Sequence, residues 1–177
     1  WGRQWRESPL MAERPIAALS ALEAWLTAHL PRTEERASIT HGDFRMGNLI
    51  FAPDAPRVIG ILDWELSTLG PALADLGFCC MAWRTGPEEF GGIRGLDLAA
   101  AGIPGREEFV AQYQRNALPG PPLQPFHEAF ALFRFAAIFV GIADRAAAGS
   151  AAGDDAARLG PLAAVFATRG LDVAERG

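Results

Sequence analysis

The stretch THGDFRMGNLIF, residues 40–51, decides how the rest of the chain is interpreted. It brings an imidazole, a carboxylate, a guanidinium and an amide together in His41, Asp43, Arg45 and Asn48, and it ends in the apolar, strand-like sequence NLIF. Asp and Asn are common turn residues, so each of them alone fits an ordinary loop. The same four groups could also form a catalytic loop, and the stretch by itself leaves both interpretations open.

The residues that follow predict a β-hairpin. The runs NLIF and RVIGILDW are short and rich in β-branched and large apolar residues, and APDAP between them has the composition of a turn. We therefore expect residues 48–51 to pair with residues 58–62. The polar cluster would then lead into the first strand, and Asp63 would lie at the end of the second.

The remaining sequence predicts helices. Ser8-Pro9 has the form of a helix start, and apolar residues recur every three or four positions from there to Leu30, so one helix is expected over residues 8–30. Further helices are expected near residues 72–83, 105–117, 125–149 and 154–169. Phenylalanines 126, 130, 133 and 139 have helical spacing and should pack in the core. The prediction is a single α+β domain over residues 1–177, mainly α, with helices around one small hairpin.

Composition excludes several classes of function. The 177-residue chain has a net charge of −5 and no basic stripe, which argues against nucleic acid as a partner. Cys79 and Cys80 are adjacent, so they are expected to be reduced, buried and not zinc ligands. The start of the sequence lacks the apolar segment of a secretory leader. The most apolar run, residues 130–143, contains Arg134 and is too short to span a bilayer. We therefore expect a cytoplasmic protein without a membrane partner.

The spacing of the polar residues fits phosphoryl transfer. Protein kinases carry the catalytic loop H-R-D-x-x-x-x-N, followed by a metal-binding aspartate in D-F-G. His41, Asp43, Asn48 and Asp63 match these positions, with Gly42 in place of the Arg and Trp64-Glu65 in place of Phe-Gly. The reaction needs a carboxylate to orient the attacking hydroxyl and oxygen ligands for Mg²⁺. Arg45 is either a donor to the transferred phosphoryl group or a solvated side chain.

Three segments, HGDFRMGNLIF, VIGILDWELSTLGPALADLG and CCMAW, resemble the aminoglycoside phosphotransferase-like family. Within it, the chain is most similar to domains related to those fused to acyl-CoA dehydrogenases. The resemblance implies a protein-kinase-like fold, ATP as phosphoryl donor, Mg²⁺, and a small-molecule hydroxyl as acceptor.

The resemblance also implies roles for individual residues. Asp43 would be the catalytic base in a loop over residues 41–48, and Asn48 and Asp63 would bind Mg²⁺, Asp63 from the segment 62–65. His41 and Asp75 would support the loop. Trp83, Arg84 and Phe90 border a loop where family members bind their acceptors, and Trp83 and Arg84 are weaker candidates for substrate binding. Glu65 is another weak candidate, because it could face either the substrate or solvent.

The chain departs from the family pattern at its start. Family members have an N-terminal lobe with a glycine loop and a lysine that binds the ATP phosphates. Here all sixteen basic residues are arginine, and the glycine cluster GGIRG, residues 91–95, follows the catalytic loop. We therefore expect the C-terminal lobe of a kinase, inactive in isolation and prone to self-associate through the surface that the missing lobe would cover.

The acceptor stays open from the sequence. An aminoglycoside is polycationic and would need an acidic pocket, whereas the likeness to domains linked to acyl-CoA dehydrogenases favours a hydroxyacyl compound. The alternative to an enzyme lobe is a non-catalytic binding or interaction domain that kept the kinase-like fold.

Overall fold

The protein is mainly helical and contains two small antiparallel sheets. The computed structural model describes residues 2–31, 37–149 and 159–176. The helices are α1 (Gly2–Arg6), α2 (Pro9–Glu13), α3 (Ala17–Ala28), α4 (Leu73–Arg84), α5 (Arg106–Asn116), α6 (Pro125–Ala147) and α8 (Leu162–Arg176). The strands are β1 (Ala37–Thr40), β2 (Leu49–Phe51), β3 (Val58–Ile61) and β4 (Thr68–Pro71), and the single-turn 3₁₀ helices are η1 (Met46–Asn48) and η2 (Trp64–Leu66). The prediction of a mainly α protein with a small β component is confirmed.

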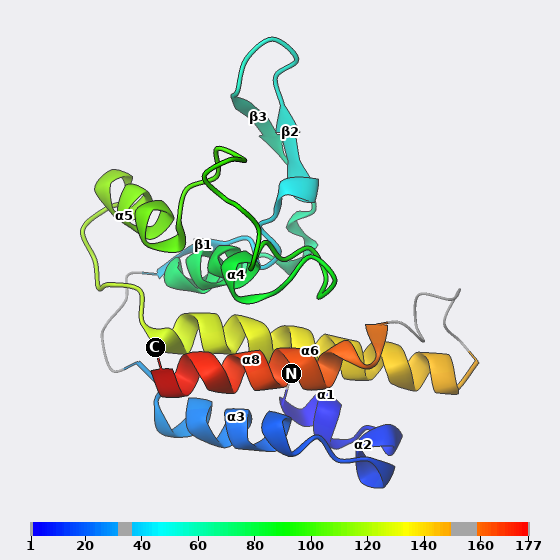
Figure 1. Cartoon of the computed structure of the whole chain (residues 1–177). Coiled ribbons are helices and arrows are strands. Elements are labelled where there is room, and N and C mark those ends of the chain that lie inside the picture. The colour runs from blue at the N-terminus through cyan, green and yellow to red at the C-terminus, as the bar shows by residue number, and fades with distance from the viewer. Residues whose placement is uncertain (1, 32–36, 150–158, 177) are drawn as a thin grey trace.

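Helices α6 and α8 form the middle layer of the molecule. Figure 1 shows α1, α2 and α3 on one side of this layer, and α4, α5 and the strands on the other. The rings of Phe139 on α6 and Phe166 on α8 lie 5.0 Å apart, edge to face, and both side chains are buried. Gly170 of α8 allows α3 to come close, because a Cβ at this position would lie 2.4 Å from a methyl carbon of Leu22. This packing supplies most of the hydrophobic core.

The phenylalanines predicted for the core lie on α6. Phe133 and Phe139 are buried, and Phe126 and Phe130 are partly buried against the same core cluster. By length and composition, α6 could cross a membrane, which corrects the expectation that this run is too short. However, 67% of its apolar window is buried inside the protein, as expected for a core helix.

The prediction of one continuous helix over residues 8–30 is wrong, because the structure has two helices there, α2 and α3. It starts as predicted, because the Ser8 hydroxyl caps α2 by accepting a hydrogen bond from the Met11 N–H, with Pro9 in the first turn. Helix α2 then ends, and α3 begins after Pro15. Proline has no N–H to donate and disfavours helical geometry in the residue before it, here Arg14. Arg14 accordingly has non-helical angles, φ −134° and ψ 75°.

The other helices lie close to their predicted ranges, except the last. The start predicted at residue 154 lies outside the described residues. Helix α8 continues past residue 169 to Arg176, because Val173 extends the apolar face and is buried in the core.

The strands hold two separate loops side by side. Strands β2 and β3 form the predicted hairpin, with Leu49 opposite Ile61. Strands β1 and β4 also pair, with Thr40 opposite Thr68, and this pairing was not predicted. Residues 41–48 connect β1 to β2, and residues 62–67 connect β3 to β4. Both strand pairs are antiparallel, so the end of β1 lies beside the start of β4, and the start of β2 lies beside the end of β3. The two connections therefore lie next to each other.

Candidate active site

The 41–48 loop is fixed by a carboxylate from the first turn of α4. Asp75 Oδ2 accepts the backbone N–H of His41 at 2.6 Å, and Asp75 Oδ1 accepts that of Gly42 at 2.9 Å. Hydrogen bonds to an ionised acceptor are stronger than those between neutral groups. Gly42 has a φ of +83°, and a Cβ there would lie 2.7 Å from the Leu66 carbonyl oxygen. Glycine is therefore required at this turn.

Arg134, in the middle of α6, also holds this turn. Its guanidinium Nη2 donates to the Gly42 carbonyl oxygen at 2.9 Å. Burial lowers the pKa of this guanidinium, while the charges of Asp75 and Asp43 act in the opposite direction. Sequence reasoning treated Arg134 only as an argument against a membrane span. A charged residue within an otherwise apolar helix was the signal that it has a buried partner.

His41 connects the two loops. Its side chain is buried, Nε2 donates to the Leu62 carbonyl oxygen at 2.8 Å, and Nδ1 accepts the Asp43 backbone N–H at 3.2 Å. These two bonds together require the neutral tautomer with the proton on Nε2. The imidazole also lies 4.7 Å from the ring of Trp64. His41 thus contacts both neighbours of Asp63 along the chain.

Asp43 and Asn48 interact directly. The Asn48 Nδ2 donates to the Asp43 backbone oxygen and to Asp43 Oδ2, each at 2.9 Å, and Asn48 is buried. Arg45 Nε donates to the same Oδ2 at 3.1 Å from a side chain that is 54% exposed. Within the described residues, Asp43 Oδ1 and Asn48 Oδ1 accept no hydrogen bond. One carboxylate oxygen and one amide oxygen are therefore left for a ligand.

Asp63 lies at the junction between β3 and η2. It is exposed and has left-handed backbone angles, φ 66° and ψ 55°, which are uncommon outside glycine but tolerated by Asp. The preceding residue, Leu62, donates its N–H to the Asn48 carbonyl at 2.8 Å, in addition to accepting from His41. Asp63 is therefore joined to the 41–48 loop through both backbone groups of its neighbour.

The oxygen atoms of this region suit Mg²⁺, which prefers carboxylate and amide oxygens. Asn48 and Asp63 offer one of each, on segments that Leu62 links. In the part of the chain that the structure describes, no group of three or more His, Cys, Asp or Glu side chains could hold a metal ion by itself. A cation here would need further oxygens from phosphate or water.

The weaker acceptor candidates lie elsewhere. Glu65 is exposed on η2, close in sequence to Asp63. Trp83 donates its indole N–H to the Pro104 oxygen at 3.1 Å, and Arg84 pairs with Glu128 at 2.7 Å. Trp83 and Arg84 lie at the end of α4, whereas Asp75, which holds the 41–48 loop, lies in its first turn. About 14 Å of helix therefore separates Arg84 from Asp75. The structure does not bring these two residues to the 41–48 loop.

The two cysteines are free, as expected from their adjacency. Cys80 is fully buried, and Cys79 is partly buried and donates to the Phe44 carbonyl oxygen at 3.5 Å. Burial, followed by the charge of Asp75, raises the pKa of Cys79 to about 12. Burial, followed by the charge of Glu128, raises the pKa of Cys80 to about 12. Neither thiol is suited to act as a nucleophile.

Comparison with known proteins places this geometry in a family. Residues 1–127 match the model of the phosphotransferase enzyme family. The chain is 38% identical to mouse acyl-CoA dehydrogenase family member 10 over 181 residues, which are 99% of this chain and 16% of that protein. It is 32% identical to rat acyl-CoA dehydrogenase family member 11 over 182 residues, covering 99% of this chain and 23% of that protein.

A solved structure is also similar. A Ralstonia eutropha protein, named provisionally as an aminoglycoside phosphotransferase, superposes with a TM-score of 0.90 at 39% identity, covering 99% of this chain and 53% of that one. The chain thus spans about half of this solved relative and less than a quarter of the two mammalian ones. By family match, sequence identity and fold, the chain belongs to the phosphotransferase enzyme family.

Proposed function

We propose that this chain is the C-terminal, catalytic lobe of an ATP- and Mg²⁺-dependent kinase that phosphorylates the hydroxyl of a small molecule. The observation that carries the proposal is the Asp43–Asn48 hydrogen bond, with Asp63 joined to the same loop through Leu62. The left-handed backbone of Asp63 supports it, because this geometry at a residue other than glycine is concentrated at functional sites.

Asp43 is assigned as the base. Its Oδ2 is occupied by Asn48 and Arg45, so Oδ1 is the atom that accepts the proton of the acceptor hydroxyl. The new bond forms between the acceptor oxygen and the γ-phosphorus of ATP, while the bond from that phosphorus to the ADP oxygen breaks. The proton stays on the Asp43 carboxyl until solvent removes it.

Asn48 and Asp63 are assigned as the metal ligands. When bound, Mg²⁺ would neutralise charge on the phosphate oxygens. The Asn48 nitrogen stays on Asp43, so the amide orients the base and offers its oxygen to the cation at the same time. Arg45 would have to leave Asp43 to reach the phosphoryl group, and its exposure allows this movement.

We further propose that the isolated chain does not carry out the reaction. It has no lysine to bind the ATP phosphates, and about half of the Ralstonia eutropha structure has no counterpart in it. The paired strands β2 and β3 expose the large apolar side chains of Ile50, Phe51, Val58 and Ile59, as expected of a surface that another lobe covers.

For the acceptor, we propose a hydroxyacyl compound rather than an aminoglycoside. The support is the similarity to acyl-CoA dehydrogenase family members, set against one relative named for aminoglycosides.

The experiment requires a longer protein, in which this chain is joined to the part of the Ralstonia eutropha relative that it does not cover. Transfer of ³²P from γ-labelled ATP would be measured with hydroxyacyl thioesters and with kanamycin, with and without Mg²⁺. The proposal predicts Mg²⁺-dependent labelling of the hydroxyacyl compound. Labelling of kanamycin alone would contradict the proposal that the acceptor is a hydroxyacyl compound. Labelling of an acceptor at the same rate in excess EDTA would contradict the Mg²⁺-dependent mechanism.

A further inference from the structure

A cavity separate from the 41–48 loop has five arginines in its lining. It has a volume of about 590 Å³ and lies where the C-terminal end of α4 meets the first residues of α5 and α6 and the C-terminal half of α8. The arginines in its lining are Arg84, Arg94, Arg106, Arg169 and Arg176. They come from four different segments of the chain, so their proximity is produced by the tertiary fold.

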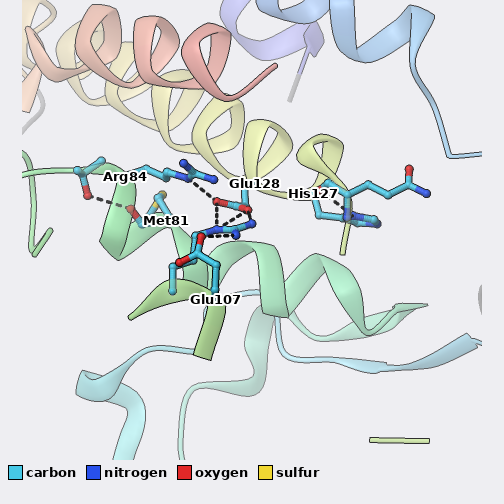
Figure 2. Close-up of polar contacts among 8 residues, drawn as sticks. Met81, Arg84, Glu107, His127 and Glu128 are labelled. Carbon is cyan, nitrogen blue, oxygen red and sulfur yellow. Dashed lines mark hydrogen bonds and ion pairs between the residues drawn. The ribbon is translucent and has the colours of Figure 1, made fainter. Parts of the chain in front are cut away.

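Two of these arginines share one buried carboxylate. Glu128 of α6 is fully buried, and it accepts from Arg84 Nε at 2.7 Å and from Arg106 Nε at 2.9 Å. Figure 2 shows the Glu128 carboxylate with dashed contacts to Arg84. One negative charge cannot neutralise two guanidinium groups, so this buried cluster keeps an excess positive charge. Glu107, which also contacts Arg106, is 83% exposed on its side chain and is therefore largely screened.

Two of the other three arginines have a carboxylate partner. Arg169 is paired with Glu89 at 2.7 Å. Arg176 reaches Asp172 only at 3.6 Å and is 79% exposed. Arg94 is exposed and makes no side-chain hydrogen bond or ion pair with the residues that the structure describes. The cavity lining holds five arginines and three carboxylates, whereas the whole chain has a net charge of −5. Glu89 and Glu88, whose charges act on Arg169, lie outside the lining.

We propose that this cavity is a binding site for the phosphate groups of a small phosphate-bearing molecule. Guanidinium groups bind phosphate through paired N–H donors, and a phosphate presents oxygens in several directions, which suits arginines that converge from four segments. A planar carboxylate has only two oxygens and satisfies fewer of these donors. The site is distinct from the proposed phosphoryl-transfer site, because Arg84 ends α4 about 14 Å along the helix from the residue that braces the 41–48 loop.

The test is calorimetric titration of inorganic pyrophosphate into this chain at low salt. EDTA is included, so that the proposed Mg²⁺ ligands Asn48 and Asp63 cannot contribute. A dissociation constant below about 1 mM is expected, and it should rise with added salt because partly exposed charges are screened. Failure to bind would overturn this site without affecting the proposed phosphotransferase function, which depends on the metal.

Matched variants locate the binding. Arg94→Gln combined with Arg176→Gln changes two exposed side chains, so the fold should persist, and circular dichroism checks this. The double variant should bind pyrophosphate about tenfold more weakly or worse. Arg57→Gln combined with Arg115→Gln, two exposed arginines outside the lining, should change affinity less than twofold. If the two double variants weakened pyrophosphate binding equally, the proposed site would be overturned. If citrate bound as tightly as pyrophosphate, the assignment of the site to phosphate would be overturned.

Discussion

The His41 imidazole donates to the carbonyl oxygen of Leu62 at 2.8 Å, and this bond joins the two loops that carry the candidate catalytic residues. Leu62 precedes Asp63, and the other ring nitrogen of His41 accepts the N–H of Asp43. One buried side chain therefore sets the relative position of the proposed base and the proposed metal ligand. A histidine in this position acts through geometry and need not exchange a proton with substrate.

Replacing His41 should destabilise the fold. His41→Ala leaves the Leu62 carbonyl and the Asp43 N–H without their partner and creates a cavity, so the free energy of unfolding should fall by about 2–4 kcal/mol. Urea denaturation measures this change. His29→Ala is the matched control, because His29 is exposed at the end of α3, and it should cost less than about 1 kcal/mol. Similar losses in the two variants would mean that His41 does not hold the loops together.

The Glu89–Arg169 pair should make the free energy of unfolding fall as the pH is lowered. The hydrogen bond from Arg169 lowers the pKa of Glu89 below its ordinary 4.5. A depressed carboxyl pKa stabilises the protein above the unfolded pKa, and this contribution is lost as pH falls through the folded value. Glu89→Gln should therefore cost about 1–3 kcal/mol near pH 7, and progressively less between about pH 5 and pH 3.

The matched control for that measurement is Glu108→Gln, an exposed glutamate that forms no ion pair with the residues that the structure describes. Its unfolding free energy should follow that of the unmodified protein across the same pH range. A Glu89→Gln penalty that stays constant down to pH 3 would contradict the role of the ion pair.

The two cysteines should be protected from modification in the native protein. The pKa of each is raised to about 12, so the reactive thiolate is scarce near pH 8. Labelling with a chromogenic disulfide at pH 8 should be slow in buffer and should reach two thiols per chain rapidly in concentrated urea. Rapid labelling of both thiols without denaturant would show that the packing around them opens readily.

The exposed apolar surface of the hairpin should make the isolated chain self-associate. Phe51 is 43% exposed on β2 and Ile59 is 52% exposed on β3. Light scattering coupled to size-exclusion chromatography should show species larger than the monomer, with a proportion that rises with concentration. Phe51→Ser combined with Ile59→Ser should shift the distribution toward monomer. A single monomeric species for the unmodified chain would contradict this prediction.

Much of the region around the candidate site could be predicted from local sequence. The hairpin was predictable because β-branched runs flank a Pro-rich turn, and the helices because of their apolar period. The pairing of β1 with β4 was missed, since Gly70-Pro71 has the composition of a turn and the partner strand is distant in sequence. The break at Pro15 could have been predicted, because proline has no N–H to donate and interrupts a helix.

The positions of side chains at the ends of helices were not predictable. Trp83 and Arg84 were placed near the acceptor, but Trp83 donates to Pro104, which precedes α5, and Arg84 pairs with Glu128, which α6 supplies where it packs on α4. That packing depends on Gly77, where a Cβ would lie 2.6 Å from the backbone of His127. The same tertiary arrangement gathers the arginines that line the cavity, which no local pattern indicates.

The central claim is that the Asp43 carboxylate accepts the proton of the acceptor hydroxyl. The most direct measurement is the single-turnover rate of phosphoryl transfer in the longer protein described above, with Asp43→Asn compared against the exposed-carboxylate control Glu108→Gln. The account predicts that Asp43→Asn lowers the rate by at least about a hundredfold while Mg²⁺–ATP affinity is retained, and that Glu108→Gln has no effect. An Asp43→Asn rate equal to that of the unmodified protein would contradict it.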